Sequence, residues 1–316
     1  MLSGCTSIHR YRAQRQVTYG DVLIETEDLE GALKAFQEAA RLDPQMAIAH
    51  SRMGLIYRRL GDYDRAIASL ADALRRDSSS FADTFDIAQL YHFTERIRDA
   101  IQAYLHAVEL RPQDFDAQLN LGVCFQQAGD FGQAVERFRV AIDIQSDRPH
   151  AYGNLGVALD AQNKHYEAIR AYREALERDT HQPLVLVNLA RTYMNQDRLK
   201  MARGALKRAI EMDPEFAAAH EALGYCSFRT RDFEAAERAY SQALTLEWRL
   251  PRAHAGLGSI HMIRYLKDKT NTDQRDQALE HWHQSLELNP GQPRVRKLIA
   301  RYRPRREDAT TALLTP

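Results

Sequence analysis

The chain has few cysteines, no excess of charge of either sign and no long apolar run. Its 316 residues include three cysteines, with no Cys-x-x-Cys pair, which excludes a disulfide framework and a zinc-binding cysteine motif. Lys plus Arg and Asp plus Glu number 43 each, and this balance argues against a general nucleic-acid-binding protein. No run approaches the about 18 apolar residues of a transmembrane helix. With 44% hydrophobic and 27% charged residues, the composition suits a folded protein.

Motifs for catalysis and for cofactor binding are also missing. The sequence contains no nucleophile elbow, no phosphate-binding loop and no clustered carboxylate pair. His281 and His283 flank Trp282 at i and i+2, which places them on different faces of a helix and does not make a metal pair. We therefore expect no enzyme activity, no cofactor and no metal.

A repeat of 34 residues occupies most of the chain. The eight units are 13–46, 47–80, 81–114, 115–148, 149–182, 183–216, 217–250 and a longer last unit, 251–292. Position 8 is small in every unit: Gly20, Gly54, Ala88, Gly122, Gly156, Ala190, Gly224 and Gly258. Position 20 is always Ala and position 24 is always large, from Phe36 to Trp282. The spacing predicts two antiparallel helices per unit, with small residues where the helix axes approach each other.

The residues at these repeat positions resemble those of the tetratricopeptide repeat family at its recognised positions, over roughly residues 13–292. The resemblance implies an all-α, right-handed superhelical solenoid of about eight helix pairs. Position 4, often Trp in the family, is His50, His220, His254 or Tyr152 in four units; we interpret the histidines as packing residues. Cys124 and Cys226 share position 10 and are interpreted as buried small hydrophobes.

Both ends of the array have their own segments. After Pro290, Val295, Leu298, Ile299 and Tyr302 lie on one helical face, which predicts a C-terminal capping helix over 293–304. Residues 305–316 lack periodicity and are expected to be disordered. Residues 1–12 are expected to be an N-terminal tether.

Asparagine recurs at position 6, which with positions 2, 5, 9, 12 and 13 faces the concave side of such a solenoid. Position 6 reads Thr18, Arg52, Asp86, Asn120, Asn154, Asn188, Ala222 and Gly256. An Asn side chain offers an acceptor and two donors, so it can pair with a peptide backbone unit. The run resembles the asparagine ladder of the O-linked N-acetylglucosamine transferase repeat domain. We predict peptide binding by the three asparagines with Arg52, Asp86 and Arg191; the alternative is that the asparagines cap or bridge neighbouring helices.

The carboxylate clamp of cytosolic chaperone-binding repeats is not matched. That device needs Lys at position 5, but here position 5 reads Val17, Ser51, Phe85, Leu119, Gly153, Val187, Glu221 and Ala255. A chaperone C-terminus is therefore rejected as the ligand. The concave face has mixed charge, which favours a ligand of mixed charge.

The chain begins Met1-Leu2-Ser3-Gly4-Cys5. Leu-Ser-Gly-Cys resembles the lipobox of bacterial lipoproteins, in which the Cys is acylated. No basic and apolar signal segment precedes it. We expect a bacterial envelope lipoprotein that faces the periplasm, lipidated at Cys5, if the true start lies upstream of Met1. Otherwise we expect a cytoplasmic protein with a reduced Cys5.

Three functions remain open at this point. The first is a non-catalytic scaffold that binds a protein or extended peptide in its groove. If Cys5 is acylated, it resembles the tetratricopeptide lipoproteins that help to assemble pili or secretion pores, attached to a membrane only through the lipid. The second is a regulatory or substrate-recruiting subunit of a transferase or other enzyme complex. The third is a self-assembling structural scaffold. The sequence does not give the oligomeric state.

Overall fold

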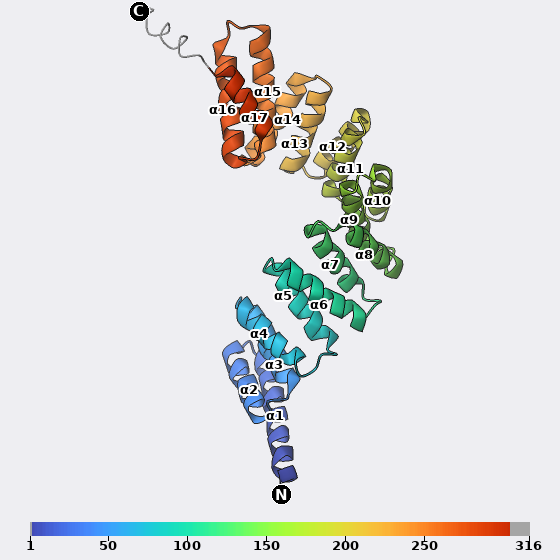
Figure 1. Ribbon diagram of the computed structural model, residues 1–316, viewed down its shortest axis with the longest axis vertical. Coiled ribbons are helices and arrows are strands. Elements are labelled where there is room, and N and C mark those ends of the chain that lie inside the picture. Colours follow the sequence, from blue (N-terminus) through green and yellow to red (C-terminus); the bar gives the residue numbers. More distant parts are fainter. Residues whose placement is uncertain (1, 304–316) are drawn as a thin grey trace, which may run out of the picture. The chain divides into compact units, whose positions relative to one another are not determined.

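The computed structural model describes residues 2–303, and all regular structure in that range is helical (Figure 1). Within each of the two compact units described below, successive helices form the predicted antiparallel pairs, and a short capping helix follows the last pair. The helices are α1 (Leu2–Glu25), α2 (Leu29–Leu42), α3 (Ala47–Arg59), α4 (Tyr63–Leu74), α5 (Phe81–Phe93), α6 (Ile97–Leu110), α7 (Phe115–Gln127), α8 (Phe131–Ile144), α9 (Pro149–Ala161), α10 (His165–Arg178), α11 (Pro183–Asn195), α12 (Leu199–Met212), α13 (Ala217–Arg229), α14 (Phe233–Leu246), α15 (Pro251–Lys267), α16 (Thr272–Leu288) and α17 (Pro293–Tyr302).

The chain divides into two compact units, each described here by itself. Unit 1 comprises residues 1–162 with α1–α9, and unit 2 comprises residues 163–316 with α10–α17. Within residues 2–303, no helix is long and apolar enough to cross a membrane.

The small residues at position 8 pack directly against the large residues at position 24. The sequence predicted a close approach of the two helices at position 8 but placed the position 24 side chain in a wider gap. A Cβ built on Gly122 would lie 2.6 Å from Cε1 of Phe138, and one on Gly54 would lie 2.7 Å from Cγ of Leu70. In unit 2, a Cβ on Gly224 would lie 2.5 Å from Cδ1 of Tyr240. Such distances are below van der Waals contact, so a side chain there would push the two helices of the pair apart. This packing explains why glycine, which costs about 1 kcal/mol in a helix interior, is retained in these helices.

The turn in the middle of each of the first seven repeats uses one left-handed residue at position 15. These residues are Glu27, Gly61, Glu95, Gly129, Asn163, Asp197 and Arg231, with φ between 57° and 81°. The next residue, position 16, often caps the following helix. The side chains of Asp28, Asp62, Asp130 and Asp232 each accept a hydrogen bond from a backbone N–H in the first turn. The sequence analysis did not predict the left-handed residue, because only two of the seven are glycine.

The first and last pairs extend beyond the simple repeat. Residues 1–12, predicted to be a tether, are helical from Leu2 onward, and α1 continues through Ala13 without a break. No glycine or proline separates Cys5 from Ala13, so nothing stops the helix there. The side chain of Cys5 lies outside the part that the structure describes. In the last pair, the extra residues lengthen both helices, since α15 and α16 have 17 residues each.

The predicted cap is present as α17. Val295 is buried, and Leu298, Ile299 and Tyr302 pack with Trp282 of α16. This apolar face covers the C-terminal end of the last repeat in unit 2. The tail predicted to be disordered, 305–316, lies outside the described residues.

The side chain at position 4 joins neighbouring repeats through one backbone carbonyl. His220 and His254 place Nε2 2.9 Å from the Pro214 carbonyl and 3.0 Å from the Trp248 carbonyl. Gln118, at the same position, donates to the Pro112 carbonyl at 3.0 Å. Each carbonyl belongs to position 32, six residues earlier. The packing role predicted for these histidines is therefore accompanied by a hydrogen bond to the loop between repeats.

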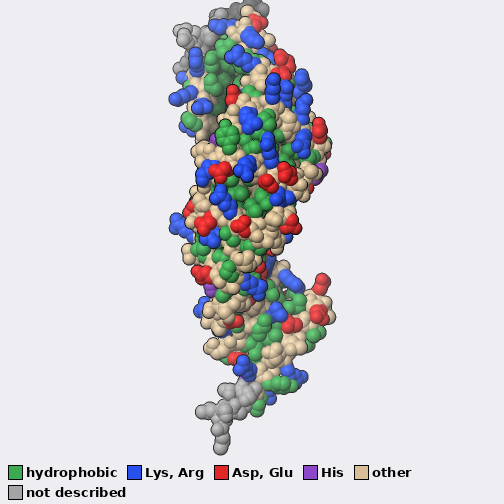
Figure 2. Space-filling model, turned by 90° about the vertical axis from the view of Figure 1, so that its right-hand side faces the viewer, with side chains coloured by type: hydrophobic (Ala, Val, Ile, Leu, Met, Phe, Trp, Pro, Cys, Tyr) green, Lys and Arg blue, Asp and Glu red, His purple; other side chains and the backbone are tan. Residues whose placement is uncertain are grey.

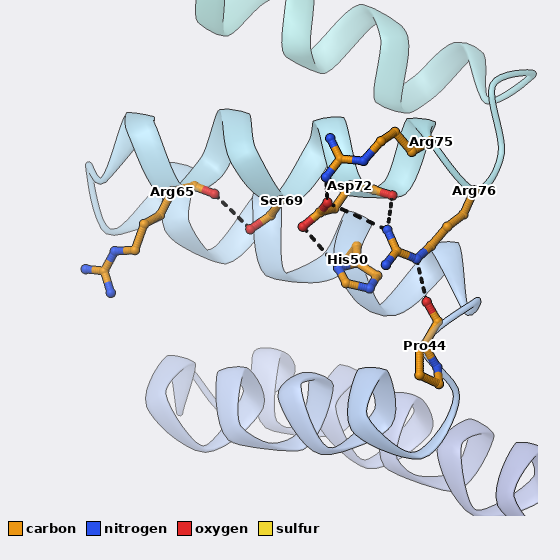
Figure 3. Close-up of polar contacts among 7 residues, drawn as sticks. All are labelled: Pro44, His50, Arg65, Ser69, Asp72, Arg75 and Arg76. Carbon is orange, nitrogen blue, oxygen red and sulfur yellow. Dashed lines mark hydrogen bonds and ion pairs between the residues drawn. The ribbon is translucent and has the colours of Figure 1, made fainter.

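His50 departs from this pattern. The Pro44 carbonyl accepts instead from Arg76, which reaches it from the end of α4 (Figure 3). The Nε2 atom of His50 is buried without a hydrogen-bond partner, and Nδ1 lies 4.0 Å from Asp72. Burial and the adjacent Arg76 and Arg75 lower the pKa of His50. His50 is therefore held in the neutral form where the first two repeats meet.

Candidate functional site

A cleft in unit 1 lies where three consecutive first helices of repeats, α3, α5 and α7, meet. Its volume is about 560 Å³. The lining residues are Arg58, Tyr63, Gln89, Leu90, His92, Phe93, Tyr104 and Asn120. Arg58, Gln89, His92, Phe93 and Asn120 occupy positions 6, 9, 12 and 13, which the sequence analysis placed on the concave side of the solenoid. We call this site the unit 1 cleft.

The charged wall of the unit 1 cleft is an ion pair. Arg58 of α3 lies 3.1 Å from Asp86 of α5, measured from Nη1 to Oδ1. Burial raises the pKa of Asp86, the nearby Asp83 adds to the increase, and Arg58 opposes it. The Arg58 guanidinium remains partly exposed. A ligand carboxylate can therefore reach Arg58 from the solvent side while Asp86 holds the guanidinium in place.

The opposite wall is aromatic and polar. Phe93 is 66% exposed, although its ring centroid lies 4.7 Å from that of Tyr63. His92 contacts Gln127 of α7, with Nε2 3.0 Å from Oε1. An exposed aromatic ring inside a polar cleft provides an anchor for an apolar side chain of a partner. The sequence analysis did not name Phe93 or His92, but reading positions 12 and 13 along the array would have found both.

The three predicted asparagines do not share one environment. Asn120 lines the unit 1 cleft, and its side chain interacts with the Tyr104 hydroxyl, an interaction that lowers the otherwise raised pKa of Tyr104. Asn154 is half-buried on α9 of unit 1, and Asn188 is half-buried on α11 of unit 2. Asn120 therefore faces the cleft and also interacts with a residue of the preceding helix, α6 (Ile97–Leu110). Peptide binding by the three asparagines stays a prediction.

Two of the three predicted charged residues, Arg52 and Asp86, form ion pairs within the protein. Arg52 of α3 lies 2.8 Å from Asp21 of α1, measured from Nε to Oδ1, and does not line the unit 1 cleft. Asp86 does not line the cleft itself, but it forms an ion pair with Arg58, which does. In unit 2, Arg191 lies close enough to Glu221 to influence its ionisation, and it does so together with Arg252. Burial raises the pKa of Glu221, and the two arginines oppose that increase. The sequence analysis did not include Glu221 among the site residues.

Cys124, Cys226 and His281 lie within the packed repeats, whereas His283 is exposed. Cys124 and Cys226 are buried free thiols, as predicted, and burial raises the pKa of Cys124 to about 12. His281 does not pair with His283 but with His254, their Nδ1 atoms lying 3.2 Å apart. Among residues 2–303, no group of three or more His, Cys, Asp or Glu side chains is arranged to hold a metal ion.

Comparison with known proteins gives the family of the chain. Two profiles, both described as tetratricopeptide repeat, match residues 19–81, 85–149 and 187–262, and residues 149–181. The BBSome complex member BBS4 homolog of Drosophila melanogaster is 22% identical over 118 residues, which are 37% of this chain and 24% of that protein. The chain thus spans about a quarter of the length of the curated relatives it matches.

Two solved structures have a similar fold. The C-terminal part of a repeat-containing protein from Cytophaga hutchinsonii has a TM-score of 0.61 and 21% identity, covering 76% of this chain and 99% of that chain. YrrB, described as a repeat protein with an unusual peptide-binding site, has a TM-score of 0.54 and 20% identity, covering 60% of this chain and 98% of that chain. These likenesses concern the fold alone. The repeat pattern, the helix pairs and the matching profiles agree. They show that the chain belongs to the tetratricopeptide repeat family.

Proposed function

We propose that the protein is a non-catalytic scaffold that binds an extended peptide segment of a partner protein in the unit 1 cleft. The observation that carries this proposal is the convergence of Arg58, Phe93 and Asn120, from three successive first helices, on one open cleft. Together they offer a cation, an apolar ring and an amide. A peptide needs the same three partners for its carboxylate, its apolar side chain and its backbone.

The ligand that fits best carries an apolar side chain next to an acidic residue. Phe93 is the largest exposed apolar group of the cleft, and Arg58 is its exposed cation. Gln89 of α5 and Asn120 of α7 also line the cleft, where they can pair with backbone groups of any sequence. Selectivity would then come from the side chains that meet Phe93 and Arg58.

Site-specific photo-crosslinking tests this proposal. A benzoylphenylalanine at position 93 should capture a partner in cells, whereas the same group in place of Ala68, which is exposed on α4 of unit 1, should not. The captured protein should lose affinity on Phe93→Ala. Equal capture from both positions, or no capture from position 93, would show that the unit 1 cleft is not the binding site.

The proposal includes a place at a bacterial envelope membrane, and this part rests on Leu2-Ser3-Gly4-Cys5 alone. The native product should fractionate with membranes and take up labelled fatty acid, because several acyl chains on one terminus anchor a protein stably. Cys5→Ser should abolish both, since a hydroxyl is a much poorer nucleophile than a thiolate. A native product that stays unlabelled would end this part of the proposal and leave the peptide-binding function untouched.

A further inference from the structure

Gly204 is a helix-interior glycine that no packing contact requires. It lies in the middle of α12, and a Cβ built on it would meet nothing within 4 Å. Glycine at such a place costs about 1 kcal/mol relative to alanine. At the same repeat position, 22, the other units all carry a side chain: Lys34, Ala68, Gln102, Glu136, Arg170, Arg238 and Glu280. The glycine leaves open space on this surface of unit 2.

That open space is part of a crevice between α10 and α12. The crevice has a volume of about 480 Å³, and α11 forms its floor. Leu186 and Leu189 of α11 are almost fully buried below it, while the half-buried Leu176 of α10 and the exposed Met201 of α12 lie at its sides. With only a hydrogen atom at Gly204, a partner backbone can approach α12 closely. We call this site the unit 2 crevice.

The rim of the unit 2 crevice is basic. Arg173 and Arg208 line it from opposite sides, with one carboxylate, Glu177, beside them. Arg173 is oriented by donating a hydrogen bond to the Tyr193 hydroxyl at 3.0 Å. Helix α12 carries four basic residues, Lys200, Arg203, Lys207 and Arg208, and one acidic residue, Glu211. Within residues 2–303, none of these four basic side chains forms an ion pair.

Exposed hydrophobic side chains between Lys and Arg side chains occur on the whole face shown in Figure 2. Exposure alone therefore does not mark a site. The unit 2 crevice differs because a hollow, an apolar floor, a glycine without an internal role and arginines at the rim coincide there.

We propose that the unit 2 crevice binds an acidic amphipathic helix of a partner protein. Leucine-like side chains on one face of that helix would enter the hollow above Leu186 and Leu189. Acidic side chains beside them would pair with Arg173 and Arg208, because charge complementarity selects the partner and sets its orientation. The helix backbone would pass over Gly204. This inference is independent of the unit 1 cleft and concerns a second partner surface.

A designed peptide tests the inference on the full-length protein. The probe is a fluorescein-labelled helix with leucine at i, i+3, i+4 and i+7 and glutamate at the other positions. Its anisotropy should show binding at least about tenfold tighter than that of a scrambled peptide of the same composition, and of a peptide with lysine in place of glutamate. Gly204→Leu should fill the hollow and weaken binding at least about tenfold. Reversal of charge by Arg173→Glu with Arg208→Glu should do the same.

Matched variants separate this site from others. Ala68→Leu places the same side chain at the same repeat position in unit 1 and should leave binding unchanged. Gly204→Ala keeps the hollow largely open and should change affinity less than about threefold. Phe93→Ala removes the anchor of the unit 1 cleft and should have no effect. The inference is overturned if the scrambled peptide binds equally well, if Gly204→Leu matches Ala68→Leu, or if Phe93→Ala abolishes binding.

Discussion

Gly122 in α7 and Gly204 in α12 are both glycines in helix interiors, but their surroundings are opposite. A Cβ at Gly122 would lie 2.6 Å from the ring of Phe138, whereas a Cβ at Gly204 would meet nothing within 4 Å. Each glycine costs about 1 kcal/mol of helix stability relative to alanine. At Gly122 the close approach of α7 and α8 offsets that cost. At Gly204 no contact within the described chain offsets that cost. The glycine there lies on an open surface and not at an internal contact.

The largest expected effect lies at the packed glycine. Gly122→Leu should destabilise unit 1 by about 3 kcal/mol, because the new side chain must displace the Phe138 ring. In an array whose repeats contact mainly their neighbours, hydrogen exchange should rise over α7 and α8 and the adjacent helices. Ala68→Leu is the control, since Ala68 is exposed on α4. Exchange that rises evenly along all of the helices, or not at all, would contradict the assigned register.

The asparagines extend the comparison to polar side chains on the first helices of the repeats. Replacing Asn120, Asn154 and Asn188 together with Ala should leave helicity nearly unchanged, because Ala is the better helix former. Affinity for the partner captured at Phe93 should fall by about 2 kcal/mol or more, at about 1 kcal/mol for each lost neutral hydrogen bond. Isothermal titration calorimetry measures this change.

The single variant Asn120→Ala sharpens that result. A loss equal to that of the triple variant would assign the whole effect to the unit 1 cleft. A partner that binds the folded triple variant with unchanged affinity would remove the asparagines from the site.

A smaller loss of stability is expected when the pH is lowered, and it arises where α15 packs against α16. His254 Nε2 lies 3.0 Å from the Trp248 carbonyl oxygen, and His254 Nδ1 lies 3.2 Å from Nδ1 of His281. Burial, with His254 and His261 nearby, lowers the pKa of His281, and Glu280 opposes this. Below its ordinary pKa of 6.5 the unfolded state therefore binds more protons than the folded state. Stability should be complete at about pH 8 and should fall as the pH drops below 6.5.

The buried Trp282, next to His281, reports this change through its fluorescence during denaturation. In the variant His281→Gln the loss of stability between about pH 8 and pH 5.5 should be smaller, because the titrating group is gone. A wild-type unfolding midpoint that stays constant over this range would contradict the account.

The fold was predictable from the sequence because its packing repeats every 34 residues. Gly54, Gly122 and Gly224 lie where the repeat predicted a close approach of two helices. The extension of α1 to Leu2 and the lengthening of α15 and α16 were not predicted, since a repeat pattern says nothing about segments that deviate from it.

The candidate sites were harder to predict for the same reason. A residue that belongs to a binding site differs from the residues at the same position of the other repeats, so the repeat pattern does not predict it. Phe93 stands out through its exposure together with its repeat position, and Gly204 stands out only through the space around it. The three asparagines were visible in the sequence as a run, but Asn120 alone lines the unit 1 cleft.

The most direct test of this account is to replace the two glycines with the same residue. Gly204→Ala should raise the free energy of unfolding of unit 2 by about 1 kcal/mol, since the helix gains and nothing clashes. Gly122→Ala should lower that of unit 1 by about 1 to 3 kcal/mol, because its Cβ meets the Phe138 ring. Native-state hydrogen exchange of α12 and α7 measures both. Changes of opposite sign are predicted, and changes of the same sign would contradict the account.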